Sequence, residues 1–213
     1  MSDTTPPDLQ RWETRFAAPD YVFGTKPNAF LAREAGRLKP GGTVLAVADG
    51  EGRNGVFLAE RGMDVLSVDF SPKAREKAEK LADARGVTLR CETADLRNWA
   101  WPEAAYDAVV AIFIQFASPD FRPRLFANML AALKPGGILL LEGYRVEQLA
   151  YKTGGPSDVA HLYTETMLRE AFAAADILLL AAVDRDIHEG EGHRGRSALI
   201  DLVARRKPAL QDK

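Results

Sequence analysis

The chain has 213 residues and a formal net charge of -2, with 46% hydrophobic and 27% charged residues. This composition indicates a globular protein with one sizeable core, and the near-neutral charge argues against a nucleic-acid binder held by a large basic field. A single cysteine, Cys91, excludes an internal disulfide and disfavours a cysteine-based zinc site, and no apolar run reaches the ~18 residues that a membrane helix requires.

The N-terminal segment, residues 1–38, predicts an aromatic and helical arm ahead of the core. It carries Trp12, Phe16, Tyr21, Phe23 and Phe30, and its first ten residues lack the apolar stretch of a secretory signal. We therefore expect a single domain over residues 1–213, made of an arm (1–38) and a core (39–213), in a cytoplasmic protein.

From residue 43 onward, apolar strands alternate with helices. Strands are expected at residues 43–48, 64–68, 87–91, 106–114, 138–142, 177–184 and 197–204, and helices at residues 53–61, 71–85, 118–133 and 164–174. Repeated strand–helix–strand units with apolar strands indicate an α/β fold, a doubly wound Rossmann-like sheet covered by helices on both faces. The last two strands have no helix between them, so they predict a hairpin at one edge, joined by a polar loop over residues 188–196.

The loop after the first strand reads Ala48-Asp49-Gly50-Glu51-Gly52-Arg53-Asn54-Gly55. Its glycines satisfy the G-x-G-x-x-G pattern of dinucleotide-binding loops, which is weak evidence alone because any tight strand–helix turn favours glycine. Its position after the first strand strengthens the prediction, since ligands of doubly wound sheets bind beyond the carboxyl ends of the strands.

The charges in this loop favour one ligand over another. A pyrophosphate prefers a helix N-terminus free of negative charge, whereas this loop carries Asp49 and Glu51. The ammonium and sulfonium groups of S-adenosylmethionine would be attracted by the same carboxylates, which favours that cofactor over NAD or FAD. The alternative is that both carboxylates point to solvent.

Acidic residues also follow the second and third strands. Asp69 stands where a carboxylate accepts both ribose hydroxyls of a bound nucleoside; the less favoured alternative is that it caps the helix that begins near Ser71. Asp95 is predicted to bind the amino edge of an adenine, with Leu96 packing on the ring.

Taken together, these motifs resemble class I S-adenosylmethionine-dependent methyltransferases. The resemblance lies in residues 44–52, Asp69, Ala94-Asp95-Leu96, residues 106–112 and Leu133-Lys134-Pro135-Gly136-Gly137. The ends of the chain are similar to a bacterial subgroup near the tellurite-resistance and thiopurine-type methyltransferases, through Trp12, residues 15–16 and 21–28, Thr153-Gly154-Gly155-Pro156 and Glu191-Gly192-His193-Arg194-Gly195.

The resemblance implies a seven-stranded, mostly parallel sheet with an antiparallel C-terminal strand. It also implies that Ala48, Asp49, Gly50, Glu51, Gly52, Asp69, Asp95 and Leu96 line the S-adenosylmethionine site, and that Gln115 faces both cofactor and acceptor. Two positions depart from the family pattern: Ala46 replaces an acidic residue and Ala48 replaces the first glycine. Asp49 is the residue expected to supply the missing carboxylate.

Methyl transfer from a sulfonium is an in-line displacement that chiefly requires positioning, and it needs a general base only when the acceptor arrives protonated. His193 is the candidate base, and His193-Arg194 resembles a His-Arg pair associated with catalysis in tellurite methyltransferases. Arg194 and Arg196 are suited to attracting an anionic acceptor. The alternative is a solvated polar loop, and His161 and His188 are expected at the surface.

The sequence thus predicts an enzyme that transfers a methyl group from S-adenosylmethionine to a small molecule such as a thiol or a chalcogen oxyanion. We expect no metal, no nucleic-acid partner and no membrane partner, and a monomer or homodimer. An NAD-type oxidoreductase, a non-catalytic S-adenosylmethionine-binding protein and an RNA methyltransferase remain as alternatives.

Overall fold

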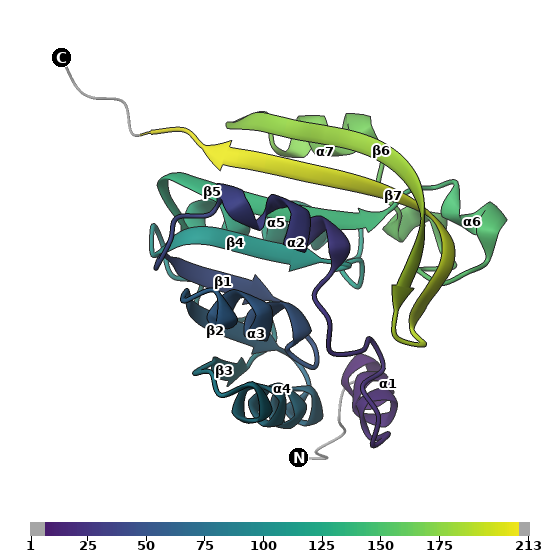
Figure 1. Ribbon diagram of the computed structural model, residues 1–213. Coiled ribbons are helices and arrows are strands. Elements are labelled where there is room, and N and C mark those ends of the chain that lie inside the picture. The colour runs from purple at the N-terminus through teal and green to yellow at the C-terminus, as the bar shows by residue number, and fades with distance from the viewer. Residues whose placement is uncertain (1–6, 209–213) are drawn as a thin grey trace, which may run out of the picture.

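The computed structural model describes residues 7–208, so the predicted ends of the arm and of the core, 1–6 and 209–213, lie outside it. A single seven-stranded sheet, in the order β3-β2-β1-β4-β5-β7-β6, runs through the described chain (Figure 1). The strands are β1 (Thr43–Val47), β2 (Asp64–Asp69), β3 (Arg90–Thr93), β4 (Tyr106–Ile112), β5 (Leu133–Tyr144), β6 (Ala175–Glu189) and β7 (His193–Arg206).

The first five strands pair in parallel, whereas β7 is antiparallel to both β5 and β6. This arrangement confirms the predicted α/β class, the strand count and the antiparallel C-terminal strand. The carboxyl ends of β1, β2 and β4 meet at one edge of the sheet, which is the edge where ligands of doubly wound sheets bind.

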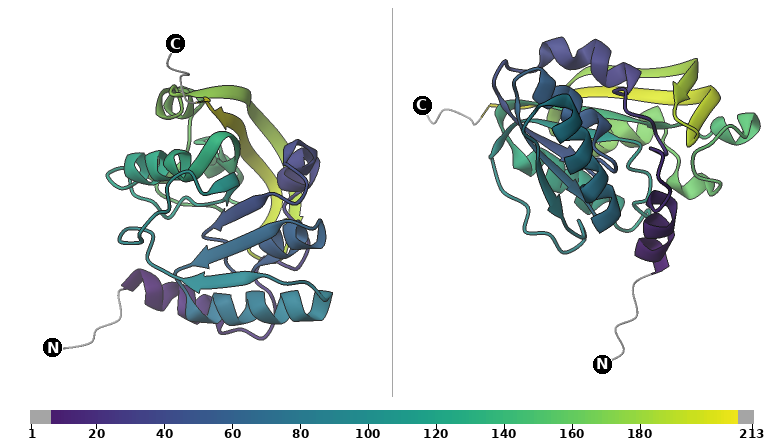
Figure 2. Two further views of the ribbon diagram at one scale, coloured as in Figure 1. Left: turned by 90° about the vertical axis from the view of Figure 1, so that its left-hand side faces the viewer. Right: turned by 60° about the horizontal axis from the view of Figure 1, so that its bottom comes forward.

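Helices lie on both faces of the sheet (Figure 2). They are α1 (Pro7–Phe16), α2 (Ala29–Glu34), η1 (Ala35–Arg37), α3 (Arg53–Glu60), α4 (Pro72–Arg85), α5 (Arg122–Ala132), α6 (Gln148–Tyr151), η2 (Val159–His161) and α7 (Glu165–Ala171), where η denotes a 3₁₀ helix. Among residues 7–208, no helix has the length and apolar character to cross a membrane.

The apolar strands are explained by the helices on their two faces. Side chains alternate along a strand, so Val44 and Ala46 of β1 pack with α2 and α3, whereas Leu45 and Val47 pack with α5 and α7 on the other side. Because both faces are covered, both sets of side chains must be apolar, which is the pattern that predicted a central strand.

The structure corrects one predicted strand and one predicted loop. The third strand begins at Arg90 rather than at residue 87, because Val87 and Leu89 pack against the cluster between α3 and α4. The polar loop expected at residues 188–196 is instead a strand-to-strand turn, with β6 ending at Glu189 and β7 starting at His193. Gly190 has a φ of +68°, and a Cβ there would lie 2.4 Å from the backbone oxygen of Val22, so only glycine fits between the hairpin and the arm.

A buried polar network fixes the second half of the arm to the core. The Asn28 side chain accepts a hydrogen bond from the Leu31 amide, which caps α2, and donates to Glu142 Oε1 (2.6 Å) and Glu189 Oε1 (3.0 Å). Glu189 in turn pairs with Arg53 at the start of α3, with 2.6 Å between Oε2 and the guanidinium. Three elements remote in sequence therefore meet at one buried carboxylate.

Replacing Arg53 with Met should lower the free energy of unfolding by about 3–5 kcal/mol, because it leaves the Glu189 charge buried without its cation. The Arg53 and Glu189 side chains are only 6% and 8% exposed. Chemical denaturation measures the change. Arg85→Met is the matched control, since Arg85 pairs with Glu60 at the surface and its loss should cost about 0–1 kcal/mol. Equal effects of the two substitutions would contradict the assignment.

Candidate functional site

The glycine loop turns the chain sharply from β1 into α3. Ala48, Gly50 and Gly52 have φ values of +48°, +60° and +84°. A Cβ on Gly52 would lie 2.5 Å from the Cβ of Ala78 in α4, so the absence of a side chain is what allows the loop and α4 to approach each other. Ala48 takes the same left-handed conformation at the position where the family has glycine.

Asp69 ends β2 directly opposite this loop. Its two carboxylate oxygens accept hydrogen bonds from the amides of Gly50 (2.8 Å) and Ser71 (2.9 Å). Burial raises the pKa of Asp69, and the nearby Glu13 carboxylate adds to the increase. Ser71 itself caps α4 by accepting a hydrogen bond from the Ala74 amide (3.1 Å), so Asp69 supports the loop and the helix start rather than serving as the cap.

The two carboxylates of the loop already have protein partners. Asp49 Oδ2 accepts from the Gly55 amide (3.1 Å) and from the Ser67 hydroxyl (3.0 Å), and burial raises its pKa to about 7. Glu51 is 2% exposed and pairs with Lys77 at 2.7 Å. Neither carboxylate points to solvent, and Lys77 compensates the charge of Glu51. These two residues therefore attract the positive groups of S-adenosylmethionine less strongly than the sequence predicted.

The third predicted acidic position is more open. Asp95, after β3, is partly exposed and accepts hydrogen bonds from the amide and the guanidinium of Arg97, each at 3.0 Å. The Leu96 side chain is 4% exposed and belongs to the main apolar core, so packing within the protein already surrounds it.

Gln115 joins the ends of two strands. Its side chain accepts from the Tyr144 amide (2.6 Å) and donates to the backbone oxygens of Tyr144 (2.9 Å) and His161 (3.0 Å). Because both ends of the amide are engaged with backbone groups, the side chain fixes β4 to β5 and to the segment after β5.

His193 and Arg194 are not brought together. They are adjacent on β7 and therefore point to opposite faces. The His193 ring is 9% exposed and lies 4.5 Å from the ring of Phe23 and 4.2 Å from that of Phe113, centre to centre. The Arg194 side chain is 64% exposed and pairs only with Glu191 (3.3 Å), so it lies away from the buried histidine.

Burial, together with the positive charges of Arg53 and Arg15, lowers the pKa of His193 to about 3. The imidazole is therefore neutral at physiological pH. Its Nδ1 atom and the hydroxyl of Tyr144 are buried without a hydrogen-bond partner in residues 7–208. Tyr144 was not among the predicted site residues, because an aromatic residue at the end of a strand is usually part of the core.

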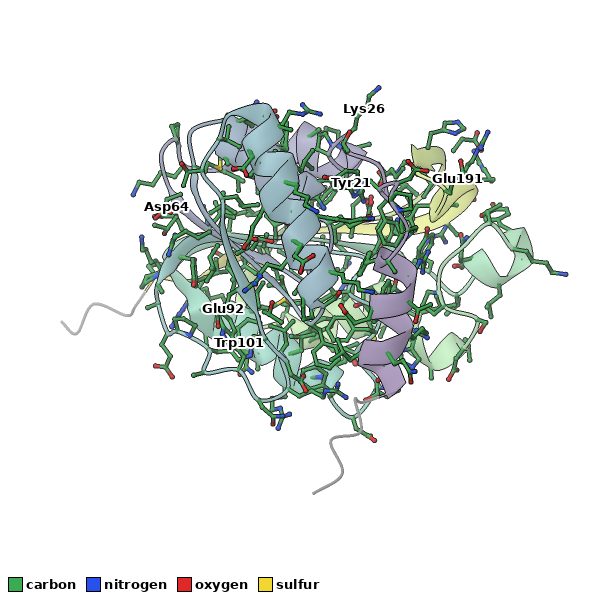
Figure 3. All side chains as sticks on the ribbon, turned by 90° about the horizontal axis from the view of Figure 1, so that it is seen from below. Tyr21, Lys26, Asp64, Glu92, Trp101 and Glu191 are labelled. Atoms are coloured by element: carbon green, nitrogen blue, oxygen red, sulfur yellow. The ribbon has the colours of Figure 1, made fainter. Side chains whose placement is uncertain are left out.

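The arm covers this edge of the sheet. Phe16 is 3% exposed, and its ring would contact a Cβ on Gly50 at 3.6 Å. Trp12 stacks on Phe16 at 5.3 Å, and the Arg15 guanidinium lies between the rings of Trp12 (5.3 Å) and Phe23 (4.8 Å). In Figure 3, Tyr21 of the arm lies beside α4, where its hydroxyl donates to the Lys77 backbone oxygen (3.1 Å).

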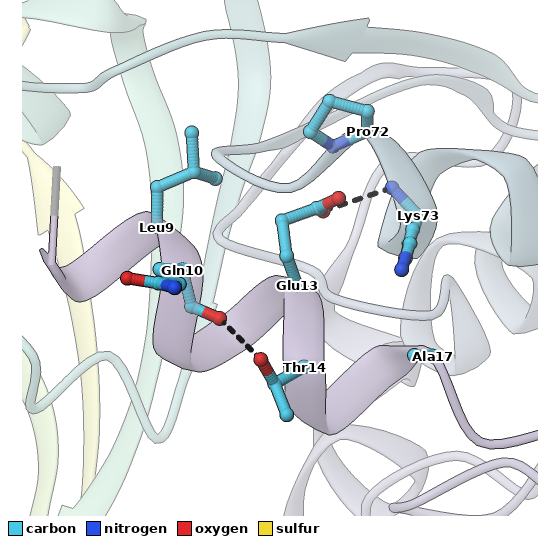
Figure 4. A pocket seen from close by; sticks show the side chains of 7 residues that line it. All are labelled: Leu9, Gln10, Glu13, Thr14, Ala17, Pro72 and Lys73. Atoms are coloured by element: carbon cyan, nitrogen blue, oxygen red, sulfur yellow. Dashed lines mark hydrogen bonds between the residues drawn. The ribbon is translucent and has the colours of Figure 1, made fainter. Parts of the chain in front are cut away.

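The first helix of the arm is attached next to Asp69. Glu13 accepts hydrogen bonds from the Ser71 hydroxyl and from the Lys73 amide (3.2 Å). Figure 4 shows the hollow between α1 and the start of α4, lined by Leu9, Gln10, Glu13, Thr14, Ala17, Pro72 and Lys73. The arm thus approaches the edge of the sheet from the side of the second strand.

Comparison with known proteins decides between the cofactors that the sequence left open. A family model described as a methyltransferase domain matches residues 44–137, the segment that contains the glycine loop, Asp69 and Asp95. Residues 44–137 are therefore a methyltransferase domain. The cofactor that this domain implies is S-adenosylmethionine, and the NAD-type alternative is discarded.

Relatives of the methyltransferase domain act on varied acceptors. The chain is 34% identical to a demethylmenaquinone methyltransferase of Deinococcus radiodurans, over 46% of this chain and 41% of that protein. It is 33% identical to a glycine/sarcosine N-methyltransferase of Halorhodospira halochloris, over 46% and 38%. These matches span less than half the length of each relative.

Solved structures agree with the fold of the whole chain. TehB from Haemophilus influenzae superposes with a TM-score of 0.70 at 18% identity, covering 93% of this chain and 67% of that one. A structure solved for the conversion of a disulfide bond into a thioacetal group during echinomycin biosynthesis gives a TM-score of 0.76 at 20% identity, covering 93% and 91%. At these identities the likeness establishes the fold alone.

Asp69 and the glycine loop fit the nucleoside part of S-adenosylmethionine. Each Asp69 oxygen accepts one amide, and a carboxylate oxygen accommodates two donors, so both retain capacity for a ribose hydroxyl. Gly50 and Gly52 keep side chains out of the loop beside it. Within residues 7–208 no group of three histidine, cysteine or acidic side chains is arranged to hold a metal ion.

The raised pKa of Asp49 predicts a pH-dependent stability. Its folded pKa of about 7 exceeds the ordinary value of 3.8, so the folded state binds the proton more tightly than the unfolded state. This carboxyl therefore makes the protein less stable as pH rises from about 4 to about 7. Asp49→Asn should remove that decline, measured as the difference in unfolding free energy between variant and wild type across this range. Asp120→Asn, at an exposed site, is the control; a parallel response of both variants would refute the assignment.

Proposed function

We propose that this protein transfers the methyl group of S-adenosylmethionine to a small-molecule acceptor, such as a thiol or a chalcogen oxyanion. The cofactor supplies an electrophilic methyl group when bound. In this proposal, residues 48–52, Asp69 and Asp95 hold the cofactor, and Leu96 and Gln115 support the site from the core.

The observation that carries the small-molecule assignment is the enclosure of the acceptor side. The Gly192 amide donates to the Val22 backbone oxygen (3.0 Å), so the arm and the β6–β7 hairpin are joined directly. Phe23 packs on His193 beneath this contact. A side closed by backbone contact favours a compact acceptor over a polymer, and the net charge of -2 supports the same preference against nucleic acid.

The relatives support a small molecule without selecting one. Relatives named for small-molecule acceptors include the demethylmenaquinone and glycine/sarcosine enzymes, whereas a protein-L-isoaspartate O-methyltransferase of Gloeobacter violaceus is 32% identical over 46% of each chain. The enclosed site therefore supports a small molecule as the class of acceptor, and the relatives do not identify which one.

We further propose that His193 contacts the acceptor as a neutral imidazole. A group with a pKa of about 3 is a weak proton acceptor at neutral pH, but an unpartnered buried Nδ1 is well suited to hydrogen bonding with a bound molecule. Arg194, exposed on the outer face of the hairpin, is able to attract an anion toward the entrance but does not reach the buried ring.

Titration calorimetry tests the cofactor assignment. Wild-type protein should bind S-adenosylmethionine and S-adenosylhomocysteine, and Asp69→Ala should weaken both by about 10-fold or more, because the ribose hydroxyls lose a charged acceptor. Asp64→Ala, at the exposed start of the same strand, is the control. Equal affinities for Asp69→Ala and wild type would exclude the ribose role.

A screen of thiols, hydroxylated compounds and selenite, with S-adenosylhomocysteine release as the signal, then tests methyl transfer. Turnover with one class supports the proposed function. Tight cofactor binding without turnover on any of them would support a non-catalytic S-adenosylmethionine-binding protein instead.

A further inference from the structure

His161 lies at the carboxyl ends of two central strands. It ends the 3₁₀ helix η2, in the segment between β5 and α7, and its ring Nδ1 is 2.9 Å from the backbone oxygen of Gln115, just after β4. The Gln115 side chain returns a hydrogen bond to the backbone oxygen of His161 (3.0 Å). These reciprocal contacts place the half-buried ring at the edge where ligands of doubly wound sheets bind.

The short helix that carries His161 is itself held in place. The Asp158 carboxylate accepts from the Ala160 amide (2.9 Å), and the Arg122 guanidinium donates to the Ala160 backbone oxygen (2.9 Å). The backbone that carries the ring is therefore held by side chains of neighbouring segments, and a fixed position is what a group that acts on a bound molecule requires.

The contact with Gln115 also determines which ring nitrogen carries the proton. A backbone carbonyl oxygen only accepts hydrogen bonds, so Nδ1 must be the protonated nitrogen of the neutral ring. The lone pair is then on Nε2, which makes no hydrogen bond to any group in residues 7–208. A carbonyl that orients one imidazole nitrogen in this way leaves the other free to take a proton.

Neither of the other two histidines combines a ring held at one nitrogen with a second nitrogen that is free and accessible. His193 is buried and its pKa is lowered to about 3, and His188 is exposed on β6, where its ring makes no hydrogen bond within residues 7–208. His193 and His161 flank the same segment, because the His193 ring lies 4.2 Å from that of Phe113 and His161 contacts Gln115 two residues later.

We propose that His161 is the general base for the methyl transfer, an inference that rests on the proposed function. Nε2 takes the proton from the acceptor's nucleophilic atom, whose electron pair forms the bond to the methyl carbon. The electron pair of the broken carbon–sulfur bond stays on sulfur. The products are the methylated acceptor, S-adenosylhomocysteine and an imidazolium that releases its proton to water.

The role of His161 as a base narrows the chemical class of the acceptor. A base is required only when the nucleophilic atom carries a proton, so the acceptor is a thiol or a hydroxyl compound rather than an oxyanion with a free electron pair. Phe116 (39% exposed), next to Gln115, and Val159 (55% exposed), in η2, are exposed apolar side chains on the two segments that His161 joins, and they suit an uncharged acceptor.

The decisive variant is His161→Asn. The Asn side-chain nitrogen takes the place of Nδ1 and keeps a donor for the Gln115 oxygen, whereas nothing replaces Nε2. With the thiol or hydroxyl acceptor found in the screen, kcat should fall about 10²–10⁴-fold and the acidic limb of the pH–rate profile should disappear. The affinity for S-adenosylhomocysteine should stay within about 2-fold of wild type. His188→Asn is the matched control and should behave as wild type.

Nuclear magnetic resonance provides a readout that needs neither cofactor nor acceptor. Long-range ¹H–¹⁵N spectra of protein labelled at its three histidines, assigned with the two variants, report the tautomer of each neutral ring. We expect a protonated Nδ1 and a bare Nε2 for His161. A protonated Nε2 would overturn the proposal.

The outcomes separate this inference from the proposed function. Loss of S-adenosylmethionine binding in wild type would reject the proposed function, whereas turnover with selenite alone would leave that function standing and reject the base role of His161. Normal kcat and an unchanged pH profile in His161→Asn, with cofactor binding intact in wild type, would reject only the role of His161.

Discussion

The buried ion pair between Arg53 and Glu189 is the contact on which the arrangement of the site depends. Glu189 is the last residue of β6, the strand at one edge of the sheet. Arg53 is the first residue of α3, the helix that follows the glycine loop. An unpaired charge cannot remain buried, so the hairpin and the loop are held at one distance from each other. Asn28 binds the same carboxylate and thereby includes the arm in this constraint.

This constraint explains why the acceptor side of the fold is closed. Once Asn28 is fixed, the chain before it must cross the carboxyl ends of the strands, where Phe23 meets His193 and Phe16 meets the glycine loop. The glycines at 190 and 192 allow the hairpin and arm to approach, because side chains there would overlap Val22 and Phe23. Enclosure of a small acceptor is thus a consequence of backbone contact between two segments far apart in sequence.

Local patterns predicted the cofactor side of the molecule more fully than the acceptor side. The strand–turn–helix signal around Gly50 and the acidic end of the second strand are encoded within a few neighbouring residues, and Asp69 lies beside the loop, where the Gly50 amide donates to it. The roles of Asp49 and Glu51 were not predictable in the same way. Their partners, Ser67 and Lys77, come from the next strand and helix, and a motif contains no information about which side chain will meet it.

The sequence by itself determined the α/β class, the seven strands with an antiparallel last strand, and the S-adenosylmethionine family, because these depend on periodicity and on short motifs with fixed spacing. Only the tertiary structure decided the states of the histidines. His193 was expected in an open loop and is instead buried, while His161 was expected at the surface and is instead bound to Gln115. Burial and hydrogen bonding depend on which segments the fold brings into contact, and those contacts join residues 46 positions apart for His161 and more than 150 apart for Glu189 and Asn28.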